Sequence, residues 1–207
     1  MGDHVFETTS SEIAYQGRIL ALRVDHVRMP GGGTATREVV EHFGAVAIAA
    51  VDAEQRIPLI YQYRHPLGRR LWELPAGLLD AAGEDPLAAA QRELKEETGL
   101  QASDWRVLID VASSPGFTDE VVRVYLAEGL TDVGRPDAHD EEADLTVHWF
   151  HITEAEQMVL RGEVVNAVAA SGILAAYAAV VDNQSTRPPA APWPDRPTAL
   201  TRRQAER

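Results

Sequence analysis

The sequence of 207 residues contains no cysteine. This absence excludes disulfide bonds, cysteine-ligated zinc, iron–sulfur clusters and thiol nucleophiles. Basic residues are also scarce, because 19 lysines and arginines stand against 32 aspartates and glutamates, which gives a formal net charge of -13. Binding to nucleic acid or to an anionic membrane requires a basic surface, so the composition argues against both kinds of partner.

Long apolar runs are missing as well. The longest uncharged segment, Val164 to Val181, has 18 residues, consists mostly of alanine and valine, and is interrupted by Asn166, Ser171 and Gly172. This length is at the lower limit for crossing a membrane, so we expect a buried helix instead. Met1 to Phe6 lacks the basic and apolar parts of a secretion signal, and we expect a cytoplasmic protein.

The order of predicted elements indicates an α/β protein with strands concentrated in the first 75 residues. Apolar patterning predicts strands at residues 17–29, 38–51, 58–63, 71–74, 105–113, 121–128 and 146–152, and helices at 86–98, from 153 and from 164. We divide the chain into an N-terminal β segment (1–40), a central domain (41–182) and a tail (183–207). The tail holds five prolines and five arginines, which predicts an extended or disordered segment.

The predicted helix at residues 86–98 carries three glutamates on one face. Glu93, Glu96 and Glu97 are spaced i, i+3 and i+4, so their carboxylates lie within one turn of each other. A cluster of oxygen ligands without histidine or cysteine suits Mg²⁺ or Mn²⁺ rather than zinc. Glutamate is also a good helix former, and an acidic solvated helix face is the alternative explanation.

The residues around this helix resemble the signature of the Nudix hydrolase family, G-x5-E-x7-R-E-U-x-E-E-x-G-U, in which U is aliphatic. From Glu84 through Arg92 to Leu100 the sequence matches throughout. It departs at the front, where six residues instead of five separate Gly77 from Glu84, which a one-residue loop insertion explains. The resemblance implies a Nudix fold, a mixed β-sheet sandwiched between helices, here with a small N-terminal antiparallel sheet.

The resemblance also implies a metal-dependent hydrolase of a nucleoside diphosphate linked to another group, with several Mg²⁺ or Mn²⁺ ions per active site. Glu93 and Glu97 would bind metal directly, Glu96 directly or through water, and the main-chain carbonyl of Ala76 is a further ligand. Arg92 would orient the glutamates. Glu84, which follows the longer loop, is a further candidate metal ligand.

Three short strings point to a branch of the family, the ADP-ribose pyrophosphatases. Pro115 lies 15 residues after Leu100 in the string SSPGFTDE, and the strings YQYR and WELPAG are also similar to that branch. Taken alone, Pro115-Gly116 would be read as an ordinary turn. In this branch the general base comes from a loop after the signature helix, and the acidic residues 137–144 provide Glu142 as first choice and Glu141 as second.

Recognition of ADP-ribose requires cationic and hydrogen-bonding contacts. Arg64 and Arg37 are candidates to bind phosphates or stack on adenine, and Glu73 and Glu120 to accept hydrogen bonds. The remaining candidate contacts to the substrate are Leu78, Ser114, Pro115 and Gly116. The resemblance further implies a homodimer with shared active sites and exchanged N-terminal strands.

We therefore expect hydrolysis of ADP-ribose to AMP and ribose 5-phosphate. One alternative is a Nudix hydrolase of another nucleotide sugar such as GDP-mannose. An alternative of another class is a non-catalytic Nudix-like module that binds a ligand.

Overall fold

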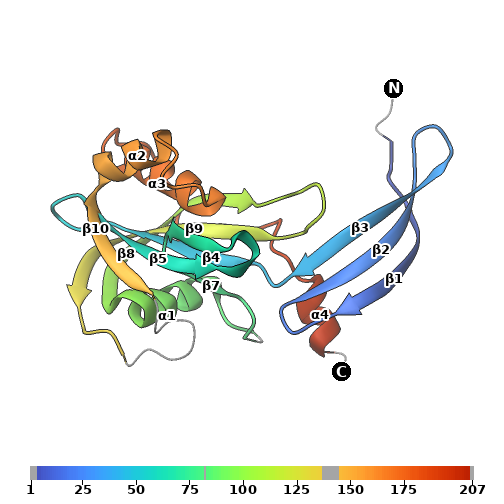
Figure 1. The fold of residues 1–207 in the computed structure, drawn as a ribbon, viewed down its shortest axis with the longest axis horizontal. Helices are drawn as coiled ribbons and strands as arrows, with labels where there is room; N and C mark the ends of the chain where they lie inside the picture. Colours follow the sequence, from blue (N-terminus) through green and yellow to red (C-terminus); the bar gives the residue numbers. More distant parts are fainter. Residues whose placement is uncertain (1–3, 82, 137–144, 206–207) are drawn as a thin grey trace. The chain divides into compact units, whose positions relative to one another are not determined.

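A computed structural model of the chain describes residues 4–81, 83–136 and 145–205 (Figure 1). The strands are β1 (Thr8–Gln16), β2 (Leu20–Arg28), β3 (Thr34–His42), β4 (Ala45–Ala50), β5 (Arg56–Arg64), β6 (Arg69–Glu73), β7 (Ala76–Leu78), β8 (Leu100–Ala112), β9 (Val121–Asp132) and β10 (Thr146–His151). The helices are α1 (Pro86–Thr98), α2 (Ile152–Leu160), α3 (Ala167–Val180), α4 (Ala199–Ala205) and the short 3-10 helix η1 (His65–Leu67).

The chain forms two compact units, which we call the small unit and the large unit. The small unit contains the described residues up to Gly44, the loop Ala112–Val121 and the described residues from Asp195 onward. The large unit contains Ala45–Val111 and, among the described residues, those from Val122 to Pro194.

The small unit is built on the antiparallel sheet β1-β2-β3, which is the small N-terminal sheet expected from the sequence. Strand β1 has the sequence TTSSEIAYQ, and most of its residues are exposed. Because it contains so few apolar residues, hydrophobic patterning did not predict it, and its backbone pairing with β2 defines it instead.

The large unit has a mixed four-stranded sheet, β7-β4-β9-β8, beside the antiparallel sheet β10-β5-β6. Strand β4 pairs in parallel with β9 and in antiparallel with β7. Alternate residues of β4 enter different cores: Ala45, Ala47 and Ala49 pack in the core with α2 and α3, and Val46, Ile48 and Ala50 in the core with α1. This confirms the mixed sheet between helices.

One sequence prediction differs from the structure. Residues 38–51, predicted as one strand, form the end of β3 and all of β4, because the extended backbone is interrupted at Gly44, which has a left-handed φ of 75°. The uncharged segment at 164–181 contains helix α3 of 14 residues, as expected, and no helix among residues 4–81, 83–136 and 145–205 is long and apolar enough to span a membrane.

The tail at 183–207, expected to be extended or disordered, has specific contacts. Arg123 of β9 is 2% exposed and donates to the carbonyls of Ala191 (2.8 Å) and Pro192 (3.0 Å). Its guanidinium lies 4.6 Å from the ring centre of Trp193. The described tail then ends in helix α4. The proline content predicted that the residues before α4 lack regular secondary structure. It did not predict the hydrogen bonds through which the buried Arg123, in a strand distant in sequence, holds Ala191 and Pro192.

Candidate active site

Helix α1 has clear local determinants at both ends. Asp85 precedes the helix, and its carboxylate accepts hydrogen bonds from the N–H groups of Leu87 (2.9 Å) and Ala88 (3.3 Å). Gly99 ends it with a φ of 75°, and its N–H donates to the carbonyl of Lys95. Burial of Leu94 fixes the rotation of the helix, so that Glu93 and Glu97 face strand β7.

Two glutamates of α1 contact the first residues of β7. Glu97 is 6% exposed, and its Oε2 accepts a hydrogen bond of 2.9 Å from the N–H of Ala76. The carboxylate of Glu93 lies directly over Gly77, so close that a Cβ atom on that glycine would overlap it. Strand β7 and helix α1 therefore hold Glu93, Glu97 and the main chain of Ala76 together.

Arg92 binds the carboxylates of Glu84, Glu93 and Glu96 at once. Its Nη1 donates to Glu93 (2.7 Å) and Glu96 (2.8 Å), while Nε and Nη2 donate to the two oxygens of Glu84 (3.1 and 3.2 Å). Hydrogen bonds with Glu84 and the charges of the neighbouring glutamates hold the pKa of Arg92 above its usual value despite its partial burial. The arginine offsets the repulsion among three anions.

Glu84 reaches this cluster although the loop before it is one residue longer than the signature requires. Gly83 takes a left-handed φ of 78°, and the N–H of Glu84 donates to the carbonyl of Ala81 (3.1 Å). The extra residue is accommodated in the loop, and Glu84 keeps its register with Arg92.

The oxygen donors in this cluster have the chemistry of a site for a hard divalent cation. Among the described residues, however, no three acidic side chains are grouped as a metal ion would need, since the carboxylates bind Arg92 and the N–H of Ala76 instead. Glu84, Glu93, Glu96, Glu97 and the main chain of Ala76 fit Mg²⁺ or Mn²⁺ by donor type.

Two predicted substrate contacts of the large unit bind each other. Arg64, at the end of β5, donates to both oxygens of Glu73 in β6 at 2.9 and 2.6 Å, and Gln62 adds a third hydrogen bond at 3.1 Å. Glu73 is 3% exposed, whereas Arg64 is exposed. The buried carboxylate therefore orients an exposed guanidinium. Leu78, at the end of β7, is partly exposed.

The other predicted substrate contacts belong to the small unit. Arg37 in β3 is exposed and donates to the carbonyl of Thr36 (2.9 Å). Ser114, Pro115 and Gly116 form a turn in which the carbonyl of Ser114 accepts hydrogen bonds from two later N–H groups. Glu120 lies 3.3 Å from Nδ1 of His42.

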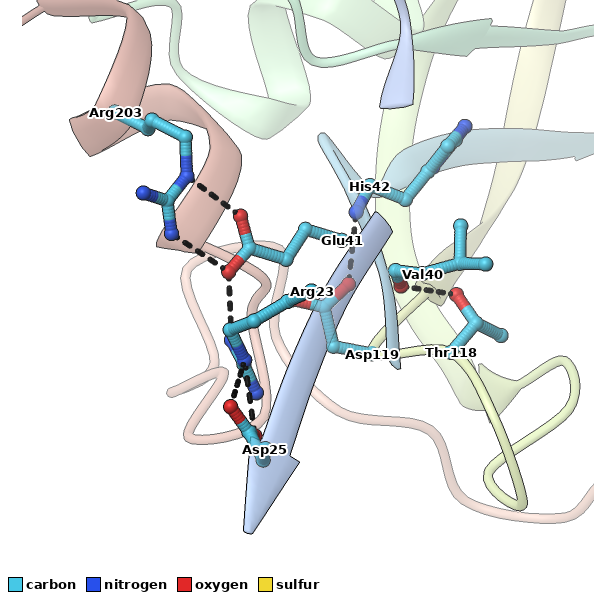
Figure 2. A network of polar contacts seen from close by, with 8 residues as sticks. All are labelled: Arg23, Asp25, Val40, Glu41, His42, Thr118, Asp119 and Arg203. Atoms are coloured by element: carbon cyan, nitrogen blue, oxygen red, sulfur yellow. Dashed lines mark hydrogen bonds and ion pairs between the residues drawn. The ribbon is translucent and has the colours of Figure 1, made fainter. Parts of the chain in front are cut away.

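The Pro115 loop is fixed to strand β3 through contacts that the sequence did not indicate (Figure 2). The N–H of Val40 donates to the carbonyl of Phe117 (2.7 Å), and the carbonyl of Val40 accepts from the N–H of Asp119 (3.2 Å) and from the hydroxyl of Thr118 (2.9 Å). The carboxylate of Asp119 accepts from the N–H of His42 (2.8 Å). Burial raises the pKa of Asp119. No spacing rule relates residues nearly 80 positions apart, so these partners could not be predicted.

The two candidates for the general base, Glu142 and Glu141, lie outside the residues that the structure describes.

Residues 41–168 match the NUDIX domain, and the chain belongs to the Nudix family, as the helix signature predicted. Residues 6–40 match the nucleoside diphosphate sugar hydrolase N-terminal domain.

Individual relatives carry more specific names. The chain is 61% identical, over its full length and that of the relative, to an ADP-ribose pyrophosphatase of Mycobacterium tuberculosis. It is 38% identical to an ADP-ribose pyrophosphatase of Bacillus subtilis, over 81% of this chain and 90% of that one. A crystal structure of an ADP compounds hydrolase matches with a TM-score of 0.75 and 18% identity, over 88% of this chain and 98% of that chain, which supports the fold.

Proposed function

We propose that the protein hydrolyses the pyrophosphate bond of ADP-ribose with Mg²⁺ or Mn²⁺, and that water adds to give AMP and ribose 5-phosphate. The observation that carries the reaction type is the convergence of Glu93 and Glu97 on strand β7 beside Arg92. The substrate is inferred from the full-length similarity to an ADP-ribose pyrophosphatase.

In this proposal the cations are held by Glu93, Glu97 and the main-chain carbonyl of Ala76, with help from Glu96 and Glu84. A bound divalent cation neutralises pyrophosphate charge and lowers the pKa of water. Arg92 keeps the glutamates side by side, because its guanidinium already contacts three of them. Glu142 is proposed as the base that accepts the proton of the attacking water, with Glu141 as the second candidate.

Substrate contacts are proposed for both units. In the large unit they are Arg64, oriented by Glu73, and Leu78. In the small unit they are Arg37, Glu120 and the turn formed by Ser114, Pro115 and Gly116. The exposed guanidinium of Arg64 suits a phosphate, because both oxygens of Glu73 fix its plane.

We further propose a cytoplasmic homodimer in which two chains share the active sites. Strand β1 is an edge strand with most side chains exposed, and Tyr15 on it is 61% exposed. Exposed edge strands are usually covered by another segment, and a second copy of the chain is the proposed cover. Analytical ultracentrifugation at several protein concentrations measures the mass, and a monomer throughout would refute this part.

A substrate panel tests the activity. With Mg²⁺ the protein should release AMP from ADP-ribose faster than it hydrolyses GDP-mannose, dinucleoside polyphosphates or NADH, and chelation should stop the reaction. Preference for GDP-mannose would assign another nucleotide sugar. Tight ADP-ribose binding without hydrolysis would indicate a non-catalytic module.

Glu97→Gln tests the metal site. The substitution keeps the acceptor for the N–H of Ala76 but removes a negative charge, so we expect kcat to fall by several orders of magnitude with little loss of stability. Quenched-flow or coupled measurement of AMP release gives the rate. Turnover at the wild-type rate would contradict the metal assignment.

A further inference from the structure

The small unit contains a buried ion network centred on Glu41 of strand β3. The carboxylate of Glu41 is fully buried and accepts two hydrogen bonds from Arg203 of helix α4, both of 3.0 Å, and one of 2.6 Å from Arg23 (Figure 2). Arg23 also donates to Asp25. Burial alone would raise the pKa of Glu41, but the hydrogen bonds from Arg203 and Arg23 lower it, so the carboxylate stays charged.

Helix α4 is attached to the sheet by apolar packing next to this network. Leu200 is fully buried against Ala21 of β2 and Phe43, the residue after β3. The side chain of Gln204 donates to the carbonyl of Arg18 (3.2 Å). Among the described residues, helix α4 is therefore held in the small unit by the apolar contact of Leu200, the buried ion pair of Arg203 and the hydrogen bond of Gln204.

The residues on either side of Glu41 hold the Pro115 loop. The backbone contacts described above between β3 and this loop are all made by Val40 and His42. The loop lies along the edge of β3 that does not pair with β2. Glu41 itself pairs with Ala21 in the β2–β3 register. A shift of β3 at Glu41 must therefore move the groups to which the loop is bound.

We propose that Arg203 and Glu41 are positioning residues, through which helix α4 fixes the Pro115 loop in the conformation that binds the substrate. The inference rests on the proposed function, in which Ser114, Pro115, Gly116 and Glu120 contact ADP-ribose. Neither Arg203 nor Glu41 contacts the substrate in this proposal. They act through strand β3.

The two arginines of α4 provide a matched pair of variants. Arg203 contacts Glu41, whereas its neighbour Arg202 is exposed and has no such contact. Arg203→Ala and Arg202→Ala remove the same charge from adjacent positions of the same helix. A general effect of tail charge or of helix propensity will affect both, and loss of the buried pair will affect only Arg203→Ala.

Two measurements on the full chain test the proposal. In the first, kcat and KM for ADP-ribose are determined with saturating Mg²⁺. Small displacements of substrate-binding groups change rates by up to roughly 100-fold, so we expect KM of Arg203→Ala to rise about 10-fold or more, with a smaller change in kcat. Arg202→Ala should behave as wild type, and Arg203→Lys should recover part of the loss.

The second measurement does not depend on activity. Amide hydrogen exchange of the ligand-free protein should become faster in residues 114–120 of Arg203→Ala and stay unchanged in α1 of the large unit. Unchanged exchange in the loop, or an equal effect of Arg202→Ala, would overturn the proposal. If Arg203→Ala does not fold, the same comparison is made with Arg203→Lys and Glu41→Gln. If wild type does not hydrolyse ADP-ribose, the proposed function fails, while the exchange result still decides the positioning role.

Discussion

Gly77 in strand β7 is the position where the smallest change should most strongly affect the candidate site. Replacing Gly77 with alanine adds one methyl group, and that carbon would overlap the Oε1, Cδ and Cγ atoms of Glu93. The main chain of β7 is held by its pairing with β4, in which Gly77 faces Val46. The side chain of Glu93 must therefore move, and it loses its 2.7 Å contact with Arg92.

The structure separates the effect on activity from the effect on stability. Overpacking in a rigid core costs about 1–3 kcal/mol, but here the group that moves is a flexible and partly exposed side chain, so we expect about 1 kcal/mol. A misplaced ligand is more harmful to catalysis, because an error of about 1 Å lowers rates by about 100-fold, equivalent to about 2.7 kcal/mol.

The assay is AMP release from ADP-ribose, combined with urea unfolding of the same samples. Gly33→Ala is the control, because a Cβ there meets no atom within 4 Å. Glu93→Ala and the double variant Gly77→Ala/Glu93→Ala complete a cycle, in which the glycine substitution should have almost no further effect once Glu93 is absent. Wild-type activity in Gly77→Ala, or additive losses in the double variant, would refute the role assigned to this contact.

Two further substitutions concern the large unit. Arg123→Met should destabilise the protein by about 3–5 kcal/mol in urea unfolding, because it leaves two tail carbonyls without their donor and leaves Asp110 with Arg187 alone; a loss below about 1 kcal/mol would contradict this. Burial favours a raised pKa for Asp110, but hydrogen bonds from Arg123 and Arg187 lower it. The ionised Asp110 therefore stabilises the protein above the unfolded pKa of about 3.9, and this stabilisation is lost as the pH falls through the folded pKa. In Asp110→Asn the free energy of unfolding should therefore fall less steeply below about pH 4 than in wild type. Parallel stability curves for Asp110→Asn and wild type between pH 2 and 5 would argue against it.

The parts of the fold that were predicted from sequence have local causes. Helix α1 was predicted with its observed bounds because Pro86 and Gly99 mark its ends. The grouping of Glu93, Glu96 and Glu97 follows from helical periodicity alone. The sequence also predicted that Glu84 keeps its spacing to Arg92, since the extra residue lies in the preceding loop, which can accommodate it.

The parts that were missed depend on contacts between distant segments. Strand β1 has almost no hydrophobic pattern, and the break between β3 and β4 depends on one glycine in an otherwise apolar run. Arg64 and Glu73 were each predicted to contact substrate, but only the pairing of β5 with β6 shows that they bind each other. The positions of the Pro115 loop and of the tail likewise depend on strands far away in sequence.

The position of Arg203 in the chain has a consequence for synthesis on the ribosome. Arg203 follows Glu41 by 162 residues, so almost the whole described chain must emerge before the buried carboxylate meets this partner. Domains generally fold as units while synthesis proceeds, and the whole large unit precedes the segment that forms α4. The small unit therefore begins first and is completed last, and a nascent chain stalled shortly before residue 195 would carry β3 without its final ion pair.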